Sequence, residues 1–93
     1  MYDDYDVMIE GAFRHLEADP RIVLSPIKRR DRMEITKNYV LARAKGDSHA
    51  EAKTLAIGRY GSPWMIMAWI AAQVIVAILK HWWENRHDKY PNT

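Results

Sequence analysis

The sequence predicts an all-α protein in which short amphipathic helices are followed by one C-terminal transmembrane helix. Apolar residues recur at helical spacing near the start of the chain, and serines stand where helices commonly begin. Residues 60–79 contain no charged side chain, although 28% of the whole chain is charged. The chain therefore divides into a polar helical N-terminal region (1–59), a transmembrane helix (60–83) and a short polar tail (84–93).

Length and composition exclude several functional classes. With 93 residues, the chain has room for one small domain. It contains no cysteine, which excludes disulfides, thiolate catalysis and cysteine-bound metal. Its net charge of +2 is too small to indicate a nucleic-acid partner. Residues 1–6 are acidic and lack an apolar run, so we expect neither a secretory signal nor a mitochondrial presequence.

The first predicted helix has one apolar face, because its large apolar residues follow helical spacing. These residues are Tyr5, Ile9, Ala12, Phe13 and Leu16. Pro20 disfavours the helical conformation for Asp19, so the helix is expected to end near residue 18. We interpret residues 21–24 as an apolar linker, because the sequence offers no second strand for them to pair with.

Two further helices complete the N-terminal region. Ser25 followed by a proline predicts the start of the second, which continues to a stop at Gly46. Ser48 and Glu51 have the spacing of a capping box and predict the start of the third. Ser62, again followed by a proline, predicts the start of the apolar helix. The three serines of the chain are thus all interpreted as helix caps, which leaves no serine nucleophile.

The apolar segment is long enough to cross a bilayer. Twenty uncharged residues make a helix of roughly 30 Å, which equals the hydrocarbon thickness. Aromatic and basic side chains flank it in the manner of a membrane interface: Tyr60 and Trp64 at one end, and Lys80, Trp82 and Trp83 at the other. We count 11 Lys and Arg residues before the segment against 3 after it. This bias predicts a single-pass protein with its N-terminal part on the cytoplasmic or interior side.

A helix that is apolar on all sides can also be buried in protein. In that alternative, residues 63–83 lie inside a soluble multi-protein particle. The flanking chain has few large apolar groups, so we expect that partners would have to supply the cover. The composition therefore favours lipid over protein as the surroundings of the segment.

Three residues in the apolar segment predict contact with another helix. Ala68 and Ala72 form a small-xxx-small pair, which lets a second helix approach closely. Gln73 places an amide near the middle of the span, where it would gain from a hydrogen-bond partner. The alternative is that the alanines are filler and that lipid tolerates Gln73.

Two charged groups outside the span are candidate binding sites. Lys28, Arg29, Arg30 and Arg32 form a basic cluster that suits phospholipid head groups or nucleic-acid phosphates. The alternative is a solvated surface with an Arg30–Glu34 pair, and no interleaved aromatics support nucleic acid. His81, Glu84 and His87 have a spacing that occurs in metal-binding bundles, but one copy is weak support, and we expect no metal or other cofactor.

These features predict a non-catalytic protein. We expect a small single-span, membrane-anchored accessory or assembly protein, either virion-associated or a subunit of a membrane complex. Its partners would be the lipid bilayer and a larger protein complex or further copies of itself. The soluble particle subunit is one alternative. A holin-like or pore-forming protein, with Gln73 lining the pore, is another.

Overall fold

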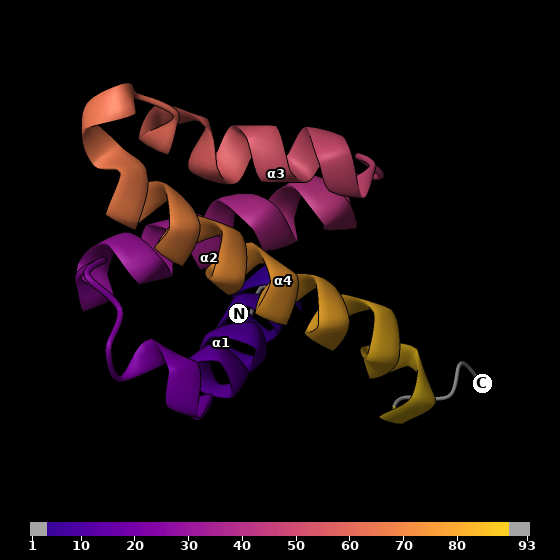
Figure 1. Cartoon of the computed structure of the whole chain (residues 1–93). Coiled ribbons are helices and arrows are strands. Elements are labelled where there is room, and N and C mark those ends of the chain that lie inside the picture. Colours follow the sequence, from indigo (N-terminus) through magenta and orange to yellow (C-terminus); the bar gives the residue numbers. More distant parts are fainter. Residues whose placement is uncertain (1–3, 90–93) are drawn as a thin grey trace.

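The computed structural model describes residues 4–89, with side chains for residues 4–86, and contains only helices in that part of the chain (Figure 1). The four α-helices are α1 (Asp4–Glu17), α2 (Arg29–Ala44), α3 (His49–Ile57) and α4 (Ile66–Lys89). Three short 3-10 helices connect them: η1 (Pro20–Ile22), η2 (Gly58–Tyr60) and η3 (Pro63–Met65). The predicted all-α class, with a long apolar helix at its C-terminal end, is confirmed.

Helix α1 has the predicted amphipathic face. Ile9, Ala12, Phe13 and Leu16 are buried in the core, whereas Tyr5 is 37% exposed. The helix ends at Glu17, and Asp19 then caps η1 by accepting a hydrogen bond from the Arg21 amide at 2.9 Å. The region interpreted as an apolar linker therefore begins as a capped 3-10 turn.

The three serines behave differently from one another. The Ser48 hydroxyl accepts a hydrogen bond from the Glu51 amide at 3.2 Å, and the Glu51 carboxylate accepts one from the Ser48 amide at 3.1 Å, so the capping box is confirmed. The prediction for Ser25 is wrong, because its hydroxyl accepts from the Ile27 amide in a turn and α2 begins only after Lys28. Ser62 precedes η3, but its side chain forms no cap hydrogen bond.

Helix α2 is the centre of the bundle and contacts each of the other three α-helices. Ile35, Tyr39 and Val40 on α2 are almost completely buried. Gly46, with a φ of 104°, turns the chain so that α3 returns alongside α2. Helix α4 then crosses α2 and α1, and its C-terminal end projects beyond them (Figure 1).

The two halves of α4 have different surroundings. Its second half is packed against the other helices through a buried face formed by Ala72, Ile75, Val76, Ile78, Leu79 and Trp83. This cover is greater than the composition led us to expect, because alanines at positions 12, 42, 52 and 56 are buried and let helices pack closely without large side chains. Over the most apolar window of Pro63–Arg86, however, only 28% of the residues are buried.

Candidate functional site

The first turns of α4 carry an exposed group of large apolar side chains. Trp64 is 91% exposed and Met67 is 69% exposed, and no residue from 61 to 71 is buried. We define the apolar tip as Trp64, Ile66, Met67 and Ile70. Ile66 and Ile70 are four residues apart and share one face of the helix, and Met67 lies on the neighbouring side, so these three side chains form an apolar stripe along one side of α4.

The chain just before the apolar tip is held firmly against the bundle. Tyr60 is buried, and its hydroxyl accepts a hydrogen bond from Arg59 Nη2 at 2.6 Å. The same Arg59 nitrogen lies 3.2 Å from Asp31 Oδ1 on the first turn of α2. This ion pair connects η2 to the beginning of α2, so the apolar tip emerges beside the basic cluster. Tyr60, which we predicted to lie at a membrane interface, is part of the core.

Two arginines of the basic cluster are held by one carboxylate on α1. Arg32 Nε lies 2.7 Å from Glu17 Oε2, and Arg32 Nη1 donates to the Ile27 carbonyl at 2.6 Å. Arg29 lies 3.4 Å from Glu17 Oε1 and stacks over the Phe13 ring. The hydrogen bond from Arg32, helped by the positive charges of Arg32 and Arg29, lowers the pKa of Glu17 below its ordinary value. These two arginines therefore fasten α1 to α2.

Glu17→Gln is expected to lower the free energy of unfolding at pH 7 by about 1–2 kcal/mol, because Arg32 and Arg29 lose their charged acceptor. A depressed carboxyl pKa stabilises the fold above the ordinary value of 4.5, and this stabilisation is lost as the pH falls through the lowered pKa. Urea unfolding of both proteins at pH 7 and pH 3 checks this expectation. The expectation would be contradicted if wild type and Glu17→Gln differed in free energy of unfolding as much at pH 3 as at pH 7.

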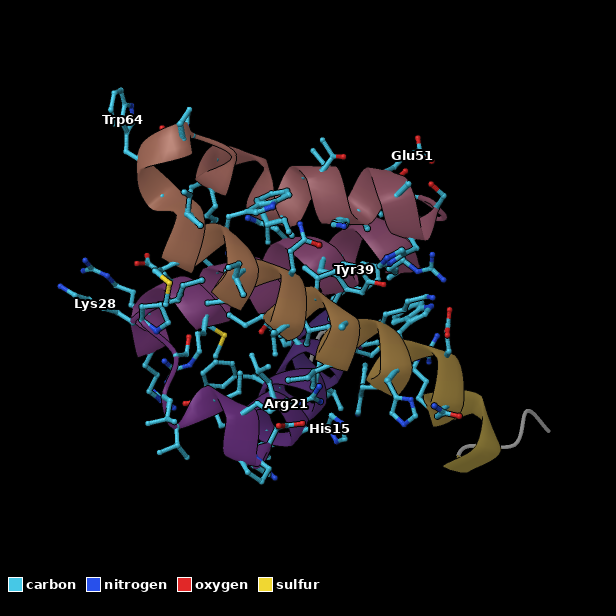
Figure 2. The ribbon with its side chains drawn as sticks, viewed as in Figure 1. His15, Arg21, Lys28, Tyr39, Glu51 and Trp64 are labelled. Carbon is cyan, nitrogen blue, oxygen red and sulfur yellow. The ribbon has the colours of Figure 1, made fainter. Side chains whose placement is uncertain are left out.

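The other two cations of the basic cluster remain exposed. Among the side chains of residues 4–86, neither Lys28 nor Arg30 forms an ion pair, and the Arg30–Glu34 pair that helical spacing allows is not made. Figure 2 shows Lys28 and Trp64 projecting from the same end of the molecule, while Glu51 lies at the opposite end. Exposed apolar and basic groups thus occur together at one end of the bundle.

The residues predicted to contact a second helix lie partly inside the bundle. Ala72 is fully buried by the chain's own helices, and Ala68 is partly buried against the same core. Gln73 is half-buried. Contact between these residues and another protein stays a prediction, because part of the face they share is already occupied.

The aromatic and basic residues near the end of α4 are also drawn toward the bundle. Trp83 is buried beneath two guanidinium groups, with Arg86 Cζ 3.8 Å and Arg43 Cζ 6.0 Å from the centre of its ring. Trp82 is half-buried and lines a cavity of about 290 Å³ between α1 and α4, together with Gly11. Lys80 lies 3.9 Å from Glu84 on the same helix. This end of α4 is therefore less available to lipid than the apolar tip.

Comparison with protein-family models, with curated proteins and with solved structures finds no match. The residues of this chain alone therefore bear on its function.

Of the possible metal ligands near the end of α4, the structure describes the side chains of His81 and Glu84. Among the residues that the structure describes, no group of three or more His, Asp or Glu side chains is placed to hold a metal ion. The Asn85 amide donates to the His81 carbonyl at 2.8 Å, and the His87 side chain lies outside the described side chains. His49 accepts from or donates to the Tyr39 hydroxyl at 3.0 Å, which gives it a structural partner.

The sequence singled out Trp64 but missed the other members of the apolar tip. Ile66, Met67 and Ile70 were expected to be equivalent to the rest of the span, since nothing in the uniform apolar run separates them from Ile75 or Leu79. Only the position of α1 and α2 distinguishes a bare half of α4 from a covered one.

Proposed function

We propose that this chain is a small membrane-attached accessory protein that acts by binding and assembly rather than by catalysis. The observation that supports this most strongly is the apolar tip, which stays uncovered although the bundle buries most of its other large apolar side chains. Exposed apolar groups gathered in one place are typical of membrane and protein contacts. Helix α4, which is long and apolar enough to cross a membrane, would be the embedded element.

The folded bundle favours attachment to one leaflet. Residues 64–70 extend over roughly 10 Å of helix, which matches the depth to which interfacial helices enter a bilayer. A complete crossing by residues 64–83 would instead require lipid to replace the protein around Ile75 and Leu79. In that second arrangement the protein is single-pass, with its N-terminal part on the cytoplasmic or interior side, as the charge bias predicts.

Membrane fractionation tests the proposal and separates the two arrangements. We expect the expressed protein to sediment with membranes. Extraction by alkaline carbonate would indicate attachment to one leaflet, whereas release only by detergent would indicate a complete crossing. Recovery of the whole chain in the soluble fraction, without any membrane-bound part, would contradict membrane attachment in either form.

A second candidate function is a subunit of a soluble multi-protein particle. It is favoured by the burial of Ala72, Ile75 and Leu79 within the chain's own bundle, so that on this helix a partner would have to cover only its first turns. In that case the protein would remain in plain buffer as part of a larger particle. Size-exclusion chromatography of the soluble fraction would then show it eluting with partners rather than with lipid.

A further inference from the structure

The charge beside the apolar tip is unevenly neutralised. Five cations occur at this end of the bundle, and three of them, Arg29, Arg32 and Arg59, are paired with Glu17 or Asp31. The remaining two, Lys28 and Arg30, are exposed and have no carboxylate partner among the described side chains. An external surface that meets this end therefore meets two free positive charges.

The free cations and the apolar tip lie at the same end of the bundle. Lys28 and Arg30 stand at the beginning of α2, on either side of Arg29 and directly before Asp31. The 3.2 Å contact between Asp31 and Arg59 holds that turn against η2, five residues before Trp64. In Figure 2, Lys28 and Trp64 extend from the same end of the molecule. A membrane in contact with the tip would therefore lie near Lys28, and Arg30 follows two residues later in the first turn of α2.

We propose that this surface binds membranes that contain anionic phospholipids, with the apolar tip in the apolar layer and Lys28 and Arg30 at the level of the phosphates. The inference rests on the proposed membrane attachment and adds the class of lipid. Charge complementarity supports this inference, because an anionic membrane would pair with the two free cations and an apolar protein partner would not. Each such charge raises the affinity of the protein for an anionic leaflet by about five-fold.

Vesicle binding at about 0.1 M salt tests this inference with the whole chain. Wild type is expected to bind vesicles of phosphatidylcholine mixed with phosphatidylglycerol more tightly than vesicles of phosphatidylcholine alone. The double variant Lys28→Gln/Arg30→Gln should lose roughly 25-fold in affinity for the anionic vesicles. Its affinity for neutral vesicles should be unchanged, and the preference of wild type should weaken as salt is added.

The matched control is Lys37→Gln/Lys45→Gln, which removes the same two charges from the same helix. Lys37 and Lys45 are exposed and lie about 13 Å or more along α2 from Lys28, which is beyond the Debye length of about 10 Å at 0.1 M salt. The control should keep most of the anionic preference. Circular dichroism should give both double variants the helix content of wild type, because all four side chains are exposed.

The outcomes separate this inference from the function it rests on. Equal binding of wild type to neutral and anionic vesicles would overturn the lipid preference and leave membrane attachment standing. Absence of binding to both would overturn the two together. An equal loss in the two double variants would assign the attraction to overall charge and remove the role of Lys28 and Arg30. If Lys28→Gln/Arg30→Gln kept the wild-type preference for anionic vesicles, the role of Lys28 and Arg30 would also be removed.

Discussion

Ile70→Arg is expected to release the protein from membranes while the bundle stays folded. Ile70 is 53% exposed in the apolar tip, so an arginine there reaches water in the free protein and disturbs no core contact. In lipid the new charge costs about 1–3 kcal/mol, depending on how deeply the position is inserted. Vesicle co-sedimentation should therefore show a loss of affinity between roughly 5-fold and 100-fold.

Val7→Arg is the matched control for this result. Val7 is also 53% exposed, but it lies on α1 next to Trp82 and Arg86, near the far end of α4. For attachment to one leaflet through the apolar tip, the control should bind vesicles as wild type does. Equal losses in the two variants would contradict attachment through the tip, and unchanged binding in both would show that the tip does not enter lipid.

Ile75→Arg is expected to unfold the bundle, which is the largest effect we predict. Ile75 has no exposed surface and lies on α4, which packs against α1, α2 and α3, so the arginine would place an unpaired charge in the core. Such a charge destabilises a protein by about 3–5 kcal/mol, a large share of the stability of a small domain. Circular dichroism during urea unfolding should show a midpoint far below that of wild type.

Ile75→Val is the conservative variant with which the effect of Ile75→Arg is compared. Removing one methylene from the core should cost only about 0.5–1.5 kcal/mol. If Ile75→Arg unfolds like wild type in the absence of lipid, the second half of α4 is not packed against the bundle in solution. The same comparison explains why a membrane-binding defect in Ile75→Arg alone says little about lipid, since loss of the fold produces the same defect.

Local signals in the sequence predicted the local structure well. The capping box at Ser48 and Glu51 and the apolar face of α1 depend on residues three to eleven positions apart, which one helix brings together without help. The start of α2 was placed wrongly because the sequence Ser25-Pro26 suits a turn as well as a helix cap. The Ser25 hydroxyl accepts a hydrogen bond within the turn, and α2 begins three residues after Pro26.

The candidate site depends on contacts that sequence spacing does not encode. The four basic residues at 28, 29, 30 and 32 looked equivalent, yet Glu17 on another helix takes up two of them. The aromatic residues predicted to flank the span were divided in the same way. Trp64 is bare, whereas Trp83 is covered by Arg43 and Arg86, because the bundle packs against only one half of α4. Tertiary packing, rather than residue type, decided which of these side chains face outward.

The division of α4 into a covered and a bare half has a consequence for how a newly made copy reaches its destination. In water the chain keeps Ile75, Val76 and Leu79 within its own fold, so the large apolar side chains that α4 exposes are confined to its first turns. For the proposed attachment to one leaflet, such a molecule is expected to reach the bilayer by diffusion after release from the ribosome, instead of being inserted during synthesis.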